Sequence, residues 1–141
     1  MSDSSRKPFF DTAILIYAVS QNDPRAEIAE HILSQGGTIS VQVLNEFAAV
    51  ARSKLAMPWE EVADALAAFR ALLKPAVPLT IELHEAALAL AARYGYQIYD
   101  ALMLAAANEA GCDVVYSEDM QDGQKIGKLT IRNPFATRRR S

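Results

Sequence analysis

Four acidic residues stand at the starts or ends of apolar segments, where an α/β fold gathers its reactive groups. Asp11 follows a short apolar run, and Asp119 lies in the loop after a β-rich run. Glu46 lies near the start of a helical pattern, and Asp100 opens a pattern that is apolar on almost every side. In a βαβ layout, strand ends and the following helix starts meet at one edge of the sheet. We therefore expect the four carboxylates to form one site.

A site built from these side chains would need a cation, because neighbouring carboxylates repel one another. Ligands that are all oxygen favour Mg²⁺ or Mn²⁺ over zinc. A hydrated divalent ion in such a site activates water and stabilises the charge of a phosphodiester transition state. The pattern therefore indicates metal-dependent hydrolysis of a phosphate ester, with Asp11, Glu46, Asp100 and Asp119 as the ligands.

Each of these residues also has a plain structural interpretation. Asp11 and Asp100 could do no more than cap the helices that follow them. Glu46 could reach solvent from the boundary of its helix, and Asp119 could belong to an acidic turn that ends at Gly123. Only the four residues together favour a metal site over these alternatives.

The segments that position these residues follow from apolar periodicity and from the punctuation between segments. Asp23-Pro24 marks one helix start and Gly36-Gly37 marks its end, while Pro58 opens a later helix. Short strands that alternate with helices predict an α/β fold with a parallel sheet covered on both faces. We expect strands at 8–10, 38–40, 113–117 and 129–131, and helices after 11 and at about 24–36, 41–54, 58–74, 82–93 and 100–110.

The composition is that of one ordinary domain spanning residues 1–141, with a frayed basic tail from about residue 136. Hydrophobic residues make up 51% of the chain and charged residues 22%. The single cysteine, Cys112, allows no internal disulfide and is expected to be buried in a reducing cytoplasm. No apolar run suits a signal peptide or a membrane span, so we expect a cytoplasmic protein. The net charge of −3 excludes a general electrostatic attraction to nucleic acid.

Four segments, in order along the chain, resemble the motifs of PIN domains, particularly those of VapC-type toxins from toxin–antitoxin pairs. The first segment is FDTAILIYA at 10–18, and the second is SVQVLNEF at 40–47. The third is YDALMLAAA at 99–107, and the last is SEDMQDG at 117–123, followed by Asn133-Pro134-Phe135. The resemblance covers nearly the whole chain.

This resemblance implies a three-layer α/β/α fold with a short, mainly parallel sheet, and Mg²⁺- or Mn²⁺-dependent cleavage of RNA. It also implies a homodimer and a small antitoxin partner that blocks the site. Carried over residue by residue, it makes Asp11, Glu46 and Asp100 the core metal ligands and Asp119 the fourth acidic residue, with the Ser117 hydroxyl near the metal.

The chain departs from the family pattern at one position and is ambiguous at another. Many members have asparagine where this chain has Ala13, so a polar contact from that position is absent. Asp122 lies close enough in sequence to share or replace the role of Asp119.

Two other functions remain open from the sequence. A Mg²⁺-dependent phosphatase could use Asp11 as its nucleophile, although haloacid-dehalogenase-like enzymes usually carry a second aspartate where this chain has Ala13. A PIN-like interaction module without activity is the other alternative, and it would not bind metal.

Arg138, Arg139 and Arg140 make the chain end basic, which is typical of a solvated tail and also suits weak phosphate contacts. Replacing all three with alanine is expected to weaken RNA binding and to reduce its salt dependence in proportion to the number of phosphates that the tail neutralises. Metal binding should stay intact. The measurement is the slope of log Kd against log salt concentration, and an unchanged slope would show that the tail makes no phosphate contact.

Overall fold

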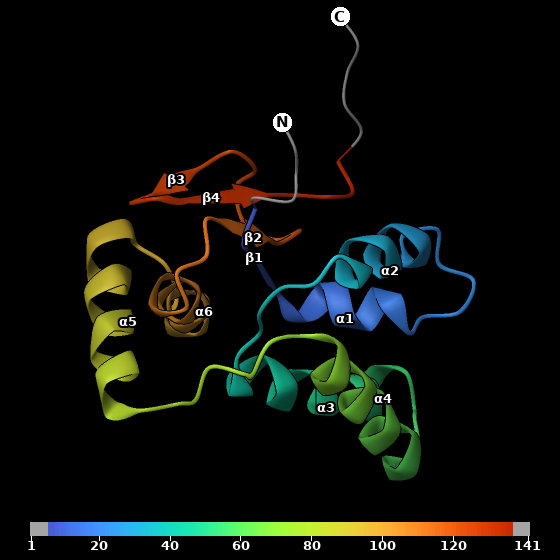
Figure 1. The fold of residues 1–141 in the computed structure, drawn as a ribbon. Helices are drawn as coiled ribbons and strands as arrows, with labels where there is room; N and C mark the ends of the chain where they lie inside the picture. The colour runs from blue at the N-terminus through green and yellow to red at the C-terminus, as the bar shows by residue number, and fades with distance from the viewer. Residues whose placement is uncertain (1–5, 137–141) are drawn as a thin grey trace, which may run out of the picture.

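The structure is a computed structural model that describes residues 6–136, which form one α/β unit (Figure 1). The three arginines Arg138, Arg139 and Arg140 lie outside the described residues. None of the described helices is long and apolar enough to cross a membrane. The strands are β1 (Pro8–Phe10), β2 (Val114–Tyr116), β3 (Lys125–Ile126) and β4 (Leu129–Arg132). The helices are α1 (Thr12–Ala18), α2 (Ala26–Ser34), α3 (Val41–Lys54), α4 (Trp59–Leu72), α5 (Ile81–Tyr94) and α6 (Ile98–Glu109).

The sheet has the strand order β1-β2-β4-β3 and is mainly parallel. β1 pairs with β2, and β2 pairs with β4, both in parallel, while the short β3 runs antiparallel to β4. Because the chain joins β1 to β2 only after six helices, the helices can cover both faces of the sheet. The prediction of a short, mainly parallel sheet is therefore confirmed.

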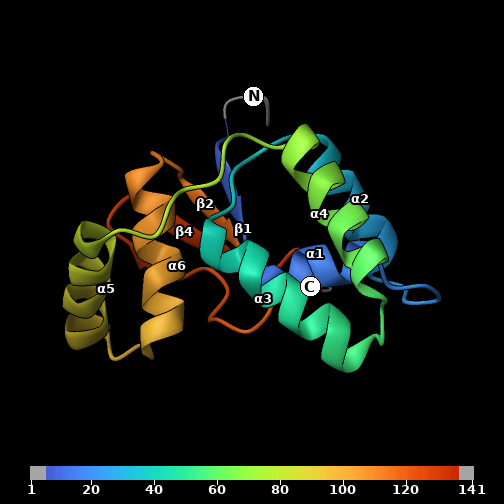
Figure 2. The same ribbon diagram turned by 90° about the horizontal axis from the view of Figure 1, so that it is seen from below.

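The helices lie in two groups with the sheet between them, as the view from below shows (Figure 2). α5 and α6 pack together on one side. The helices α1, α2, α3 and α4 lie on the other side. This is the three-layer α/β/α arrangement that the sequence predicted.

The central strands are buried on both faces, which explains why their sequences do not alternate between apolar and polar residues. Phe9 and Phe10 of β1 are fully buried, as are Val115 of β2 and Ile131 of β4. The ring of Phe10 stacks on Tyr116 in the neighbouring strand, with 5.8 Å between ring centroids. Burial of this kind contributes about 1.5–3 kcal/mol for each large apolar side chain.

Some element boundaries differ from the sequence prediction. Residues 38–40 form only isolated parallel bridges, Phe9 with Thr38 and Ser40 with Val77, so they extend the β1 edge without becoming a strand. The antiparallel β3 was not predicted, because two residues are too short to show a period. The helix predicted from Pro24 begins two residues later, at Ala26, after a turn.

The last predicted helix begins earlier than expected, at Ile98 instead of Asp100. Gln97 is its N-cap residue, so Asp100 lies inside the first turn. Capping therefore does not explain the position of Asp100.

Gly37 leaves no room for a side chain where the chain passes β1. A Cβ atom there would lie 2.5 Å from Cε2 of Phe10 and 2.8 Å from the carbonyl oxygen of Pro8. Gly37→Ala is expected to cost about 1–3 kcal/mol of unfolding free energy, because the buried Phe10 ring cannot move aside freely.

Gly36→Ala is the matched control for this prediction. Gly36 has a φ of +91° but open space around it, so its substitution adds backbone strain without a collision. The measurement is urea denaturation of both variants and the parent. A smaller loss at Gly37 than at Gly36 would contradict the steric explanation.

Candidate metal centre

Side chains from four parts of the chain line one pocket of about 570 Å³. Its acidic members are the four predicted residues: Asp11 before α1, Glu46 in α3, Asp100 in α6 and Asp119 after β2. Lys54, at the end of α3, is the one basic side chain that the described part of the chain contributes to this lining. The structure thus brings all four carboxylates to one place, and their role as metal ligands stays a prediction.

Asp11 is fixed at the end of β1 by its backbone and by both carboxylate oxygens. Its N–H donates to the carbonyl of Tyr116 in β2 at 3.0 Å. Its Oδ1 accepts from the N–H of Thr12 at 2.6 Å, and its Oδ2 accepts from the hydroxyl of Ser117 at 2.8 Å. Asp11 therefore caps α1 and faces the pocket at the same time.

Burial raises the pKa of Asp11 to about 6, well above the ordinary value of an aspartate. The hydrogen bonds from Ser117 and Thr12 oppose this rise, and the negative charges of Asp119 and Glu46 add to it. The pocket therefore disfavours a charged Asp11 unless a cation is present.

Glu46 is held in the pocket by two donors from different helices. Its Oε1 accepts from the Thr12 hydroxyl at 2.7 Å, and its Oε2 accepts from the side-chain amide of Gln42 at 3.4 Å. The hydroxyl of Ser40 caps α3 by accepting from the N–H of Val43 at 3.2 Å, which fixes the start of the helix. These contacts favour a role for Glu46 in the pocket over the interpretation that its side chain only extends into solvent.

Asp100 and Asp119 complete the pocket in different ways. Asp100 is half-buried, and its pKa is raised by burial first and then by the charges of Asp119 and Glu46. A hydrogen bond with the side chain of Gln97 lowers this pKa in part. Asp119 is exposed at the rim of the pocket, and its side chain makes no hydrogen bond to any residue from 6 to 136.

No ion pair among residues 6–136 balances the negative charge of the pocket. In that range, Arg25 pairs with Asp23 and Glu118, and the pocket carboxylates form no ion pair. Within the same range, no three Asp, Glu, His or Cys side chains are arranged to hold a metal ion directly. Mg²⁺, however, usually keeps several waters and takes only one or two carboxylates.

The size of the pocket suits an ion of that hydrated kind. Each water occupies about 30 Å³ in the liquid, so several waters and an ion fit in the space. The atoms that the four carboxylates offer to a cation are all oxygens, which hard cations prefer. The residues therefore fit a hydrated Mg²⁺ or Mn²⁺ ion better than a fully dehydrated one.

Three further expectations from the sequence concern residues near this pocket. Ser117 is fully buried and reaches the site only through its bond to Asp11. Ala13 lines the pocket without a polar group. Asp122 lies outside the lining, and its Oδ1 accepts from the N–H of Asn133 at 2.9 Å, which ties down the segment after β4. The geometry thus favours Asp119 over Asp122 as the fourth acid.

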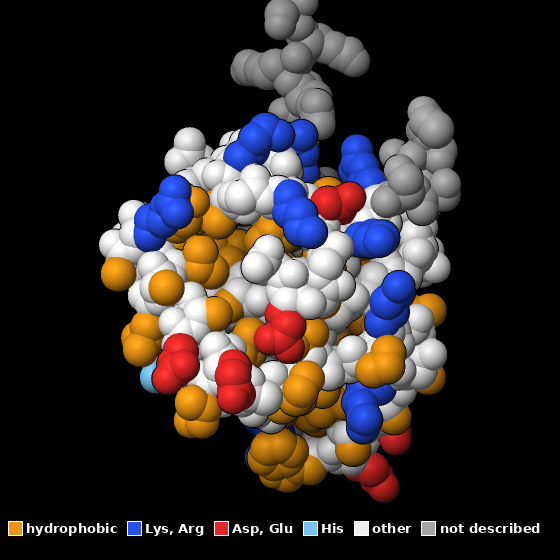
Figure 3. Space-filling view, turned by 60° about the vertical axis from the view of Figure 1, so that its left-hand side comes forward, with side chains coloured by type: hydrophobic (Ala, Val, Ile, Leu, Met, Phe, Trp, Pro, Cys, Tyr) orange, Lys and Arg blue, Asp and Glu red, His pale blue; other side chains and the backbone are white. Residues whose placement is uncertain are grey.

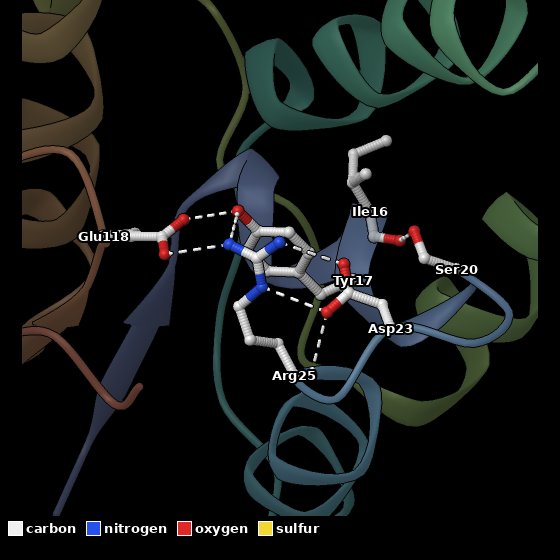
Figure 4. A network of polar contacts seen from close by, with 6 residues as sticks. All are labelled: Ile16, Tyr17, Ser20, Asp23, Arg25 and Glu118. Atoms are coloured by element: carbon white, nitrogen blue, oxygen red, sulfur yellow. Dashed lines mark hydrogen bonds and ion pairs between the residues drawn. The ribbon is translucent and has the colours of Figure 1, made fainter. Parts of the chain in front are cut away.

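A polar network beside the pocket, drawn in Figure 4, was not predicted from the sequence. The guanidinium of Arg25 lies over the ring of Tyr17, with 3.9 Å from its Cζ to the ring centroid, and contacts Asp23 and Glu118. The hydroxyl of Tyr17 donates to Glu118. Burial, followed by this bond to Glu118, raises the pKa of Tyr17 to about 12. Residues so far apart in sequence give no periodic signal that links them.

Comparison with protein-family models shows the family of the chain. The family model of the PIN domain matches residues 9–123, which include all four carboxylates. The chain therefore belongs to the PIN-domain family. A comparison with curated protein sequences gives no match.

Solved structures with the same fold include several toxins. VapC20 of Mycobacterium tuberculosis, described as a Sarcin-Ricin loop cleaving toxin, has a TM-score of 0.67 and 22% identity over 80% of this chain and 90% of its own. A toxin–antitoxin complex from Klebsiella pneumoniae has a TM-score of 0.71 and 19% identity, covering 93% of this chain and 100% of that chain. VapBC2 from Rickettsia felis, bound to a DNA fragment from its promoter, has a TM-score of 0.62 and 18% identity, covering 89% and 97%.

Substitution of Asp100 tests whether the pocket binds a metal ion through this carboxylate. Asp100→Asn keeps the shape and the contact with Gln97 but removes one negative charge. We expect it to weaken Mn²⁺ binding by about tenfold or more. Without metal its melting temperature should equal or exceed that of the parent, since repulsion from Asp119 and Glu46 is relieved. The measurements are calorimetric titration with Mn²⁺ and melting curves in chelator.

Asp122→Asn is the matched control, because an asparagine oxygen can still accept from Asn133. It should bind Mn²⁺ like the parent. Equal metal affinities for Asp100→Asn and the parent would remove Asp100 from the site.

Proposed function

We propose that this chain is a metal-dependent endoribonuclease and the toxin of a VapC-type toxin–antitoxin pair in the cytoplasm. The observation that carries the proposal is the pocket of four carboxylates, which form no ion pair among the described residues, at one edge of a PIN fold. Structures of the same fold that are described as a Sarcin-Ricin loop cleaving toxin and as a toxin–antitoxin complex support the choice of RNA and of a protein partner.

In this proposal, Asp11, Glu46 and Asp100 hold Mg²⁺ or Mn²⁺, with Asp119 as the fourth acid. The bound ion would lower the pKa of a water molecule and offset the charge of the scissile phosphate. Thr12 and Ser117 orient the carboxylates of Glu46 and Asp11 by donating to them, and so hold the ligand oxygens in place.

The walls of the pocket offer contacts for a nucleic-acid strand. Lys54 lines the pocket on the same helix as Glu46, eight residues further on, or about 12 Å at the helical rise. A cation there suits a phosphate near the one that is cut. The ring of Tyr99, which is 57% exposed beside Asp100, suits stacking with an unpaired base.

A partner surface is also part of the proposal. On the α5 side of the molecule, apolar side chains lie exposed among charged ones (Figure 3). Ile81 and Leu88 are 69% and 49% exposed and share one face of α5, since they are seven residues apart. Exposed apolar side chains of this size suit a protein interface. We propose that the protein forms a homodimer and binds a small antitoxin, in keeping with the toxin–antitoxin assignment.

The phosphatase alternative draws less support from the geometry. Both oxygens of Asp11 already accept hydrogen bonds, from Thr12 and Ser117, which hold the carboxylate as a ligand better than as an attacking nucleophile. Ala13 supplies no second acid two residues later.

The direct test is cleavage of RNA by the purified chain. Cleavage should need Mg²⁺ or Mn²⁺, stop on chelation and leave 5′-phosphate and 3′-hydroxyl ends, because attack by water does not use the 2′-hydroxyl. Ca²⁺ should replace Mg²⁺ poorly, since it prefers more ligands at about 2.3–2.6 Å.

Asp11→Asn, which keeps the size of the side chain, is the inactive control. The proposal would fail if full activity persisted in excess chelator, or if the products carried 2′,3′-cyclic phosphate ends. A phosphorylated Asp11 after treatment with a phosphoryl mimic would instead favour the phosphatase.

A further inference from the structure

The fourth carboxylate of the pocket is held differently from the other three. Asp11 and Glu46 each accept two hydrogen bonds, and Asp100 interacts with Gln97. Asp119 makes no such contact within residues 6–136, and it lies close enough to Asp11 and Asp100 to raise the pKa of both by repulsion. Within this range, no hydrogen bond to the Asp119 carboxylate therefore holds this residue at the rim, and contacts of other residues must do so.

Glu118, the residue before Asp119 in the chain, is bound to Tyr17 and Arg25. Both carboxylate oxygens of Glu118 are bound: Oε1 accepts from the hydroxyl of Tyr17, and Oε2 accepts from Nη1 of Arg25 at 3.1 Å. Tyr17 lies in α1, whose first residue follows Asp11 directly. Glu118 thus links the loop that carries Asp119 to α1, the helix that Asp11 caps (Figure 4).

Arg25 is itself fixed in this link. Its Nε and Nη2 donate to the two oxygens of Asp23, both at 3.0 Å, in the bidentate geometry that makes arginine–carboxylate pairs specific. Its Nη1 also donates to the hydroxyl oxygen of Tyr17 at 2.8 Å, and its guanidinium stacks on the Tyr17 ring. The ring of Phe135 packs against the Tyr17 ring in a T-shaped arrangement, with 5.1 Å between centroids.

A direct role for Arg25 in holding RNA phosphate fits these contacts poorly. Asp23 and Glu118 together offset its charge, and its donors already point at Asp23, Glu118 and Tyr17. An isolated pair with this exposure would contribute little to stability. The contacts of Arg25 instead fix the relative positions of three segments, because the network joins α1, the segment before α2 and the loop after β2.

We propose that Tyr17 and Arg25 are positioning residues that hold Glu118, and through it the loop 118–123, so that Asp119 stays at the metal pocket against the repulsion of the other carboxylates. The part of this inference that concerns the ion rests on the proposed function. The part that concerns the loop does not.

Two variants separate the links of the network. Tyr17→Phe keeps the ring that contacts Arg25 and Phe135 and removes only the hydroxyl, which donates to Glu118 and accepts from Arg25. Arg25→Met keeps a long apolar side chain over that ring and removes both ion pairs. Arg52→Met is the matched control, because Arg52 also lies over an aromatic ring, that of Trp59, and donates to the carbonyl of Met57, away from the pocket lining.

The first measurement is amide hydrogen exchange of residues 118–123 in metal-free protein. Tyr17→Phe and Arg25→Met should each speed exchange in this loop by about three- to tenfold, the size expected for losing a partly exposed hydrogen bond to a charged group. Exchange in β1 and α6 should not change, and Arg52→Met should leave the loop as in the parent.

The second measurement is calorimetric titration with Mn²⁺ and the Mg²⁺ dependence of RNA cleavage. Both variants should bind Mn²⁺ about three- to tenfold more weakly and need correspondingly more Mg²⁺ for half-maximal rate, while kcat at saturating Mg²⁺ stays near the parent value. Arg25→Lys should recover less than half of this loss, since lysine cannot make the bidentate contact with Asp23.

These outcomes distinguish the two proposals. Unchanged loop exchange in both variants, or the same acceleration in Arg52→Met, would overturn the positioning role. Faster loop exchange with unchanged Mn²⁺ affinity would overturn the link to the metal. A parent chain that binds no Mn²⁺ and cuts no RNA would remove the proposed function, and loop exchange would still decide whether Tyr17 and Arg25 hold the loop.

Discussion

The repulsion between four carboxylates in one partly buried pocket is the interaction on which the rest of the site depends. Burial is the largest cause of the rise in the pKa of Asp11 to about 6, and its acidic neighbours add to it. The hydroxyl of Ser117 and the backbone N–H of Thr12 oppose this rise by donating to Asp11. The hydroxyl of Thr12 and the amide of Gln42 donate to Glu46, so neutral groups bind the carboxylate oxygens without cancelling their charge. The pocket therefore keeps its negative potential and its geometry together, which is what a hydrated cation requires.

The fold holds the four carboxylates together because its parallel strands end at the same edge of the sheet. The N–H of Asp11 donates to Tyr116, and the N–H of Ser117 donates to Arg132, so neighbouring strands carry their last residues to the same level. Asp11 can then accept from Ser117 although the two are far apart in the sequence. Glu46 and Asp100 come from helices that start at the same edge of the sheet. The sheet thus sets the relative height of the carboxylates, and the helices set their direction.

The sequence predicted those features that depend on local pattern. The apolar face of the segment around Phe47 predicted a helix, and the proline at position 58 predicted the start of the next one. The four acids were recognised because each follows such an element or lies at or near its start. The role of Arg25 could not be predicted, because its contacts with Tyr17 and Glu118 exist only after the chain has folded. The early start at Ile98 was missed because Gln97 caps α6 without a side-chain hydrogen bond, and so leaves no capping signature.

The same electrostatics would connect the stability of the protein to the binding of a cation in the pocket. The pKa of Asp11 is raised in the folded state from 3.8 to about 6, so the folded protein holds this proton more tightly than the unfolded chain does. The contribution of Asp11 to stability is therefore fully present below about pH 4 and is lost as the pH rises through about 6. At neutral pH the metal-free fold carries the cost of an ionised, partly buried aspartate among like charges. A cation that binds only the folded state offsets this cost, since binding stabilises that state by mass action. Asp11 and its acidic neighbours thus destabilise the metal-free protein, and a bound ion would stabilise the protein through the same residues. This is expected where function, and not stability, determines which residue stands at a position.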